Sequence, residues 1–332
     1  MTGIDVLPSA DQMTMVDAVA RAVGDLFPIT RLDHGRKPVV VTQSDWNQIA
    51  ELGWIGMALP EEAGGVGYDL TDAVLAHRQF ARHFVTPSLL ASTVASKLAV
   101  ASADGLAQQI CSGQIRAAFV MPCAWERPEG PHYVLDPHDA ELFVTLDAQG
   151  ARFVSVDLAA ASPVEPMDST VSIVRAPSAV PAGEPDVAAG LWARALIASE
   201  LAGLAQAASE MAAAYAKIRQ QFGKPIGSFQ AVAHACADCA MRAEAAVAQS
   251  NFATIAIRDD HPDAAFQAGA AVLVAADAAF RNATSNIQVH GGMGFAMESD
   301  AHLYLKRAVL LRALGRASPA NRTEGGSGLR AE

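Results

Sequence analysis

"RQQFGKPIGSFQ", residues Arg219–Gln230, is the stretch that decides how this chain is organised. An alanine-rich run over Leu191–Phe222 leads into it, and alanine is the best helix former. Gly223 and Pro225 are residue types that end helices, and Ser228 can cap a new one. The stretch therefore predicts a corner between two helices.

The sequence after this corner has the pattern of three further helices. The second is expected to begin near Ser228 and to end before His261, and the third to continue to the glycines after His290. The fourth is expected from Ser299 to Gly315. Four helices joined by short corners predict an antiparallel bundle over residues 188–315. Residues 316–332 are small and polar and are expected to form a disordered tail.

The residues before the long helix divide into two parts. Residues 1–115 carry helical runs such as "DLTDAVLAHRQFARHF" (69–84) and "SLLASTVASKLAVASA" (88–103). Residues 116–187 contain short apolar runs, "AAFVMPCAW", "AELFVTLDA", "ARFVSVDL" and "VSIVRAP", which predict a small antiparallel β unit. We therefore expect an α+β chain that is mostly α: an N-terminal helical domain, a small middle β domain and a C-terminal four-helix bundle.

The composition excludes some classes of function. The chain has 332 residues, 35 acidic against 24 basic, and a net charge of −11, which argues against a broad nucleic-acid or anionic-membrane surface. A small molecule or another protein is the expected partner. The four cysteines occur without a secretory signal, so we expect a reduced, cytoplasmic protein. Charges, glycines or prolines are expected to interrupt every apolar run before it can span a membrane.

Two spaced motifs, "RQQFGKPIGSFQ" and "IQVHGGMGFAMESDAHLYLKRA" (287–308), resemble the FAD-dependent acyl-CoA dehydrogenase family. The turn segment "ELGWIGMALPEEAGGVGYDLTDAV" (51–74) resembles the same family, so the likeness extends from about Asp45 to Leu314. The expected domain order is also that of the family. Two motifs in the right order with compatible helices between them make a specific signal.

The resemblance assigns a set of residues to the cofactor. It implies that Arg219 reaches the pyrophosphate of an FAD bound in a neighbouring subunit, a role that suits a permanently charged planar guanidinium. The glycines would let the backbone approach the adenosine half. The residues implied around FAD are Arg219, Gln221, Phe229, Gln230, Gln288, Gly291 and Gly292, and His290 could contact the cofactor or only pack. If either motif is taken alone, the alternative to a cofactor site is that the arginine is an ordinary surface residue and that the glycine only ends a helix.

The resemblance also implies a reaction in which a glutamate removes the proton next to a thioester and flavin takes a hydride from the following carbon. Counting from the motifs, the two family positions for this base fall on Gly315 and Ala193, and neither residue can accept a proton. Arg194 follows the second position and is assigned to the substrate, an acyl-CoA thioester. Glu200, seven residues after Ala193, lies on roughly the same helix face and is the fallback base.

The expected middle domain departs from the family as well, because "AAFVMPCAW" leads into "ERPEGPHY" where the family carries a Thr- and Ser-bearing loop. The reading that accounts for all of this is a subunit that completes the FAD site of a homologous catalytic chain. Such a subunit resembles those of the heteromeric acyl-CoA dehydrogenases that act on steroid-derived CoA thioesters. The resemblance also implies an electron-transfer flavoprotein or a similar electron acceptor. The alternatives are a self-sufficient homo-oligomer that uses Glu200, or a flavin-free structural or regulatory partner.

The remaining polar residues have structural interpretations. His234, Cys236 and Cys239 lie in a helical stripe typical of a core, and no second zinc-like ligand pair follows, so we expect no metal site. The loop carboxylates Glu126 and Glu129 are expected to be exposed. A structural role is implied for Glu298. A solvated or interface face is expected for the set His302, Lys306 and Arg307.

Overall fold

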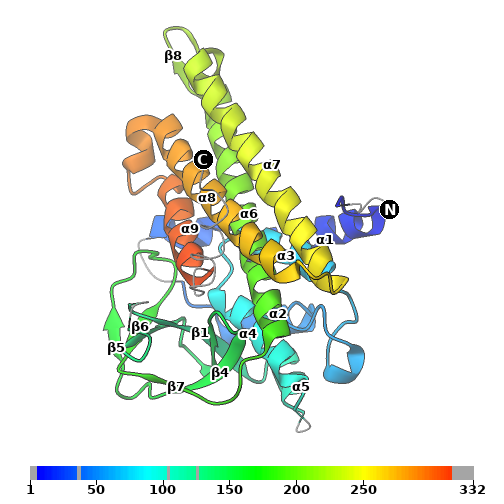
Figure 1. The fold of residues 1–332 in the computed structure, drawn as a ribbon. Helices are drawn as coiled ribbons and strands as arrows, with labels where there is room; N and C mark the ends of the chain where they lie inside the picture. Colours follow the sequence, from blue (N-terminus) through cyan, green and yellow to red (C-terminus); the bar gives the residue numbers. More distant parts are fainter. Residues whose placement is uncertain (1–5, 36–38, 103–104, 125–126, 316–332) are drawn as a thin grey trace, which may run out of the picture.

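The computed structural model of the chain describes residues 6–35, 39–102, 105–124 and 127–315. Helices, a β-sheet and then a helical bundle follow one another along the chain, which confirms the expected α+β fold (Figure 1). The predicted tail, residues 316–332, and Glu126 lie outside the described residues.

The N-terminal part is helical. Its helices are α1 (Ala10–Leu26), α2 (Gln43–Glu51), α3 (Leu70–Arg82), α4 (Pro87–Ala99) and α5 (Leu106–Cys111), with 3-10 turns η1 (Ile29–Gly35) and η2 (Glu61–Ala63). Local chemistry sets their starts. The Asp69 side chain accepts hydrogen bonds from the first backbone amides of α3, and Thr86 caps α4 ahead of Pro87, a residue that suits the first helical position.

The middle part is a seven-stranded sheet with the order β5-β6-β2-β1-β3-β4-β7. The strands are β1 (Arg116–Pro122), β2 (His132–Leu135), β3 (Ala140–Leu146), β4 (Ala151–Val156), β5 (Ser162–Val164), β6 (Ile173–Ala176) and β7 (Ala179–Pro181). One face of β1, which includes Phe119, packs on the main core, and the other, which includes Val120, packs in a smaller cluster. Both faces of this strand are therefore buried.

The expected antiparallel β unit is wrong in one respect. β1 and β3 pair in parallel, with Ala117 opposite Leu142 and Val120 opposite Thr145, while the other strand pairs are antiparallel. β2 separates β1 and β3 along the chain and lies on the far side of β1. The sheet is therefore mixed, because short apolar runs in a sequence do not reveal which strands become neighbours.

The C-terminal part is the expected four-helix bundle, formed by α6 (Val187–Ile218), α7 (Gln230–Arg258), α8 (Ala264–His290) and α9 (Ala301–Gly315). A small residue also lets α6 approach α3 of the N-terminal part closely, since a Cβ added at Gly203 would lie 2.2 Å from the Arg78 carbonyl oxygen. Asn282 of α8 donates to the carbonyls of Ala205 in α6 (3.0 Å) and Cys239 in α7 (2.8 Å). One buried amide thus links three helices.

The corner between α6 and α7 is a small hairpin of β8 (Gln220–Gln221) and β9 (Lys224–Pro225), followed by the 3-10 turn η3 (Ile226–Ser228). Phe222 and Gly223 form its two-residue loop, with φ values of 52° and 79°, as tight hairpin turns require. The expectation that Ser228 caps α7 is wrong, since its hydroxyl donates to the Pro225 carbonyl (2.7 Å) and Phe229 is the capping residue, without a side-chain bond.

A buried ion pair connects the sheet region to α9. The Arg307 guanidinium donates from Nε to Asp168 (2.6 Å), and it also bonds the Val85 carbonyl and the Thr170 hydroxyl. Arg307 is 1% exposed. The expectation of a solvated or interface face is therefore wrong for Arg307, because a carboxylate distant in the sequence neutralises its charge inside the protein.

Two helical segments, Val187–Ile218 and Ala264–Phe295, are long and apolar enough to cross a membrane by length and composition alone. The expectation that every such run is interrupted is wrong for these two segments, because α6, for example, continues without a break through Gly190 and Gly203. In the most apolar window of the first segment 78% of the residues are buried inside the protein, and in that of the second 50%. The central helices of a bundle need this apolar composition to pack.

Candidate cofactor-binding and active site

The hairpin corner lies at the end of the bundle farthest from the sheet, at the top of Figure 1. Arg219 ends α6, and its backbone is held by bonds to the Tyr215 carbonyl (2.9 Å) and from the Ile226 amide (2.8 Å). Its side chain is exposed, and no carboxylate among the described residues pairs with it. The corner thus presents a fixed backbone and an unpaired cation.

Aromatic rings and a second cation surround this arginine. The rings of Phe222 and Phe229 meet edge to face with centroids 6.1 Å apart, and Lys224 Nζ lies 4.4 Å from the Phe229 ring centre. Phe222 is 91% exposed, and Gln221 and Gln230 are exposed as well. The sequence analysis did not assign Lys224 to this site, although Lys224 lies within the Arg219–Gln230 motif.

The glycine motif lies at the end of α8. Gly291 has a φ of 60°, and no atom lies within 4 Å of a Cβ added at Gly291 or Gly292. Gly294 differs, since its added Cβ would lie 2.3 Å from the Ile287 carbonyl oxygen. The first two glycines therefore face open space, and the third is needed for packing.

The structure brings the two motifs to the same end of the bundle. Tyr215, one turn before the end of α6, stacks on His290 at the end of α8, with ring centroids 4.1 Å apart. His290 also bonds the Asn286 carbonyl through Nδ1 (2.8 Å), so it packs within the bundle. An unpaired guanidinium, exposed amides and open glycine backbone are groups that bind phosphates and nucleotides. Gln288 is exposed on the same end of α8.

The sheet lies at the opposite end of α6. Its β3–β4 turn contacts the first turns of that helix, where Arg194 donates to the Asp147 carbonyl (2.6 Å). The 32 residues of α6 rise about 48 Å at 1.5 Å each. The corner and the sheet of one chain therefore cannot meet on one ligand of ordinary size.

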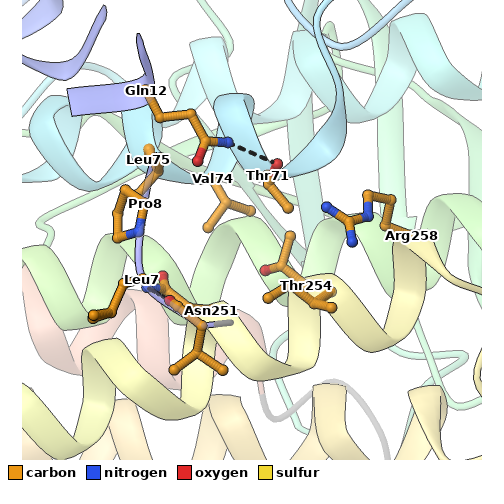
Figure 2. A pocket seen from close by; sticks show the side chains of 11 residues that line it. Leu7, Pro8, Gln12, Thr71, Val74, Leu75, Asn251, Thr254 and Arg258 are labelled. Atoms are coloured by element: carbon orange, nitrogen blue, oxygen red, sulfur yellow. Dashed lines mark hydrogen bonds between the residues drawn. The ribbon is translucent and has the colours of Figure 1, made fainter. Parts of the chain in front are cut away.

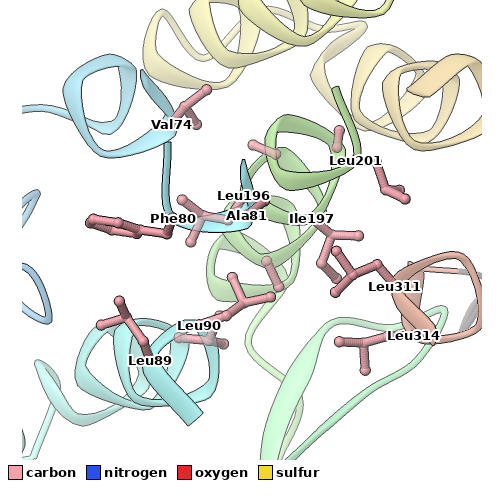
Figure 3. Packing of buried hydrophobic residues seen from close by; sticks show 14 of the residues in the cluster. Val74, Phe80, Ala81, Leu89, Leu90, Leu196, Ile197, Leu201, Leu311 and Leu314 are labelled. Atoms are coloured by element: carbon pink, nitrogen blue, oxygen red, sulfur yellow. The ribbon is translucent and has the colours of Figure 1, made fainter. Parts of the chain in front are cut away.

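The two positions counted for the catalytic base lie in packed interior. A Cβ added at Gly315 would lie 2.7 Å from Val272 Cγ1 and 3.1 Å from Ile197 Cγ2. Ala193 is fully buried one turn before Ile197. Figure 3 shows Ile197, Leu311 and Leu314 gathered between α6 and α9. Apolar side chains fill the space where a carboxylate would stand.

Glu200, the fallback base, is buried on the side of α6 that faces α3. Its carboxylate bonds His77 Nδ1 at 2.8 Å, and both side chains are almost fully inaccessible. The partner of this buried carboxylate is therefore a histidine of α3. Arg194, assigned to substrate, is also largely buried, and burial lowers the pKa of its guanidinium.

A cavity of about 310 Å³ lies between the sheet and α9. This volume falls in the lower range of small-molecule sites, roughly 300–1,000 Å³. Its wall is mostly apolar and includes Met121, Tyr133, Leu135, Ile173, Lys306 and Leu310. The sequence did not mark this cavity, because its members come from separate segments of the chain. Lys306, expected on a solvated face, is half-buried at its edge.

A smaller pocket of about 60 Å³ lies between the N-terminal segment, α3 and α7 (Figure 2). Gln12 Nε2 donates to the Thr71 hydroxyl (3.1 Å), and Asn251 Nδ2 donates to the Val6 carbonyl (3.0 Å). These bonds attach the N-terminal segment to the bundle. The pocket is far too small for a nucleotide and lies away from both motifs.

The other polar residues considered as site candidates do not form a cluster among the described residues. Cys239 is buried and accepts a bond from Arg242, while His234 is exposed. Among the residues that the structure describes, no group of three or more His, Cys, Asp or Glu side chains could hold a metal. Glu129 is exposed, as expected. Burial lowers the pKa of His302, whose ring lies half-buried near Lys306.

Comparison with known proteins places these features in a family. Residues 9–109 match the model of the acyl-CoA dehydrogenase N-terminal domain, and residues 190–322 match that of the C-terminal domain. Acyl-CoA dehydrogenase IpdE2 of Mycobacterium tuberculosis is 32% identical over 271 residues, which cover 80% of this chain and 80% of the relative. Acyl-CoA dehydrogenase FadE34 of the same organism is 35% identical over 288 residues, 78% of this chain but 38% of the relative.

Solved structures show the same fold. Butyryl-CoA dehydrogenase from Megasphaera elsdenii superposes with a TM-score of 0.78 at 21% identity, over 94% of this chain and 96% of that one. A chain of the ChsE4-ChsE5 complex from Mycobacterium tuberculosis gives 0.77 at 19% identity, over 95% and 96%. Fold, motifs and relatives agree, so this chain belongs to the acyl-CoA dehydrogenase family, FAD-dependent oxidoreductases that act on the CH–CH bond of acyl-CoA thioesters.

Proposed function

We propose that this chain is a subunit of a heteromeric acyl-CoA dehydrogenase in which it completes the FAD site of a homologous catalytic chain. One contrast carries the proposal. Apart from Phe229, the residues matched to the cofactor are exposed at one end of the bundle, whereas the positions matched to the base are closed by apolar packing at the other. The chain keeps the groups that bind a nucleotide and lacks the group that takes the proton.

The geometry supports a site shared between chains. The 24 residue steps of α6 from Arg194, which contacts the β3–β4 turn of the sheet, to Ile218 at the corner rise about 36 Å, farther than one nucleotide spans. A nucleotide held by Arg219 must therefore rest its flavin end on another chain. The open space beside Gly291 and Gly292 is where such a ligand can approach the backbone.

Each residue has a proposed task at the nucleotide. Arg219 pairs with the pyrophosphate, because a guanidinium presents a planar fork of donors to phosphate oxygens. Gln221, Phe229 and Gln230 line the same part of the site, and Gln288 with the two glycines borders the adenosine half. FAD, when bound, supplies the hydride acceptor for the oxidation.

The proton must then be removed by the partner chain. A carboxylate at Gly315 or Ala193 has no room in this chain, and the Glu200 carboxylate is engaged with His77. These contacts favour the partner over a self-sufficient homo-oligomer that uses Glu200. Arg194 faces the β3–β4 turn, so a role at substrate would require it to leave the Asp147 carbonyl.

The substrate class is proposed as a bulky acyl-CoA thioester, such as a steroid-derived one. A structural neighbour described as the Tcur3481-Tcur3483 steroid ACAD superposes with a TM-score of 0.75 at 24% identity, and the ChsE4-ChsE5 neighbour is a complex of two chains. A cytoplasmic location and an electron-transfer flavoprotein or similar acceptor complete the proposal. No nucleic acid or membrane is assigned as a partner.

Purification of the tagged chain from its host tests this proposal. A homologous chain and bound flavin should co-purify with it, and the mixed complex should oxidise an acyl-CoA while the chain alone is colourless and inert. A yellow, active homo-oligomer would instead establish the self-sufficient alternative. If the chain stays colourless with every homologous chain, this result would establish the alternative of a flavin-free structural or regulatory partner.

A single variant tests the assignment of Arg219. Arg219→Ala should lower the flavin content of the complex at least about tenfold, since charged hydrogen bonds contribute roughly 1.5–3 kcal/mol each. Both chains should remain folded, as circular dichroism would show. Arg21→Ala, an exposed arginine on α1, is the control and should retain flavin. Undiminished flavin in Arg219→Ala would refute the assignment.

A further inference from the structure

One face of the sheet carries the smaller apolar cluster, and at one end of this face the apolar side chains stop. Each of four neighbouring strands contributes a residue to the cluster: Val134 of β2, Val120 of β1, Phe143 of β3 and Val154 of β4. Two residues further toward the same end of the sheet, these strands carry His132, Pro122, Thr145 and Arg152. Because side chains alternate across a strand, these four residues face the same side as the cluster. Three polar residues and a proline thus replace the apolar ones.

A cavity of about 560 Å³, the sheet cavity, lies over this end of the face. Its volume is within the range of small-molecule sites, roughly 300–1,000 Å³. Pro122, Val154 and Pro181 are among its apolar walls, and the β3–β4 turn borders it. Met121 and Tyr133, the chain neighbours of Pro122 and His132, line the cavity beside α9 instead. The two cavities therefore lie on opposite faces of the sheet.

The β3–β4 turn fixes the guanidinium of Arg152 at this cavity. Nη2 of Arg152 donates to the Asp147 carboxylate (2.5 Å) and to Gln149 Oε1 (2.9 Å). The same carboxylate accepts from the backbone amides of Gln149 (2.7 Å) and Gly150 (3.2 Å). Within the described part of the chain, Nε and Nη1 of Arg152 form no hydrogen bond. The guanidinium therefore keeps unused donors in a fixed orientation.

Two further polar groups at the sheet cavity lack partners among the described residues. Thr145 lies opposite Arg152 in the β3–β4 pair, and its half-buried side chain forms no hydrogen bond with them. His132 is 7% exposed, and its Nδ1 is buried without a partner there. Burial lowers the pKa of His132, so its ring is uncharged at neutral pH. Unpaired polar groups in a protein cost free energy that a bound ligand recovers.

The charges around the sheet cavity favour an uncharged ligand. The described residues that line it include one cation, Arg152, and two carboxylates, Asp147 and Glu129. Asp147 already neutralises Arg152, and Glu129 is exposed to water. A charged ligand would lose hydration without gaining an unpaired partner of opposite charge inside the cavity. A carboxamide has no charge and carries both an acceptor and a donor, which match a guanidinium N–H and a hydroxyl oxygen.

We propose that the sheet cavity binds an uncharged carboxamide attached to an apolar ring. The amide oxygen accepts from Arg152 Nη1, and the amide N–H donates to the Thr145 hydroxyl. The ring lies over Pro122 and points toward His132, since the three strand intervals from β4 to β2 span about 14 Å. None of these residues is assigned to the flavin nucleotide. The inference therefore goes beyond the proposed function and does not depend on it.

Benzamide and benzoate test this proposal, because they share a shape and differ in charge. Titration of the full chain, followed by NMR of the His132 ring, should give benzamide a Kd of about 1 mM and benzoate one at least about threefold weaker. Arg152→Gln and Thr145→Val should each weaken benzamide about threefold to tenfold, the usual effect of one lost hydrogen bond. Arg175→Gln, at an exposed arginine of β6 outside the cavity lining, should leave benzamide binding unchanged.

A further variant tests the role of charge. Asp147→Asn removes the charge that neutralises Arg152 but keeps the backbone carbonyl that accepts from Arg194, so benzoate should now bind better than benzamide. Circular dichroism identifies the folded variants, and flavin content of the complex, measured separately, reports on the proposed function alone. The proposal is overturned if benzamide fails to bind at about tenfold higher concentration, or binds no better than benzoate to the unaltered chain. Full benzamide affinity in folded Arg152→Gln and Thr145→Val, or an unchanged preference in folded Asp147→Asn, would also overturn it.

Discussion

The interior around Gly315 and the corner at Arg219 use the same residue types in opposite ways. Glycine at 315 leaves no room, because Val272 and Ile197 already occupy the space beside it, whereas glycines 291 and 292 leave room that no side chain of the chain fills. The interior stabilises the monomer, and the corner exposes a cation and a phenylalanine to water. Groups that do little for the isolated chain indicate that a second molecule uses them.

The largest expected effect comes from restoring a carboxylate to the interior. Gly315→Glu should lower the free energy of unfolding by about 3–5 kcal/mol, because it combines overpacking with burial of an unpaired charge. Denaturant unfolding measures this. Gly24→Glu is the matched control, since an added Cβ there meets only His83 at an ordinary 3.7 Å. A stable Gly315→Glu chain that oxidises acyl-CoA alone would show that the interior can still serve as an active site.

The second effect concerns the buried Glu200. Glu200→Gln should lower the free energy of unfolding by roughly 1–3 kcal/mol, because it weakens a buried charged hydrogen bond to His77. Glu141→Gln, at an exposed position of β3, should change stability by less than about 0.5 kcal/mol. Activity of the assembled enzyme should follow the amount of folded protein. A much larger loss of activity would restore Glu200 as the base.

The third effect sharpens the contrast between the glycines. Gly292→Leu fills open space, so the stability of the chain should change by less than about 0.5 kcal/mol. Flavin affinity of the complex should fall at least about tenfold, which is 1.4 kcal/mol, because the added side chain occupies the proposed nucleotide position. Titration with FAD measures this, with Ala182→Leu in an exposed loop as the control. Unchanged affinity would separate the glycine motif from the cofactor.

The smallest effect is expected at Phe222. Its backbone is left-handed (φ 52°), a conformation that asparagine tolerates better than phenylalanine. Phe222→Asn should therefore leave the stability of the chain unchanged or raise it by up to about 1 kcal/mol. Its association with the catalytic chain should weaken severalfold, as pull-down titration would show. Met167→Asn, which removes an exposed apolar side chain elsewhere, should leave association unchanged.

The helices were predictable because their signals are local. Alanine-rich runs, Asp69 and Thr86 as caps, and Gly223 with Pro225 as a helix end are all read within a few residues. The motifs at Arg219 and Gly291 are local too, so the sequence could place both at the end of a helix. The sheet was harder, since β2, β5 and β7 are runs of three or four residues, too short to show periodicity.

The partners of buried charges were not predictable. Arg307 meets a carboxylate 139 residues earlier, and Glu200 meets a histidine 123 residues earlier. A periodic pattern indicates which face of a helix is apolar, but it does not indicate what packs against a charged residue. Arg307 was therefore assigned to a solvated or interface face although its charge is neutralised inside the protein.

The amino-acid sequence alone determined the helical bundle, because its helices depend on neighbours within a few turns. It also carries the two motifs that resemble the acyl-CoA dehydrogenase family, and the resemblance implies that positions 193 and 315 lack the glutamate. Only the tertiary structure decided that the space beside Gly315 is filled, that about 36 Å of α6 separates the corner from the β3–β4 turn of the sheet, and that Phe266 and Leu273 of α8 are exposed. These depend on distances between segments far apart in the chain. Packing fixes such distances, and no local pattern encodes them.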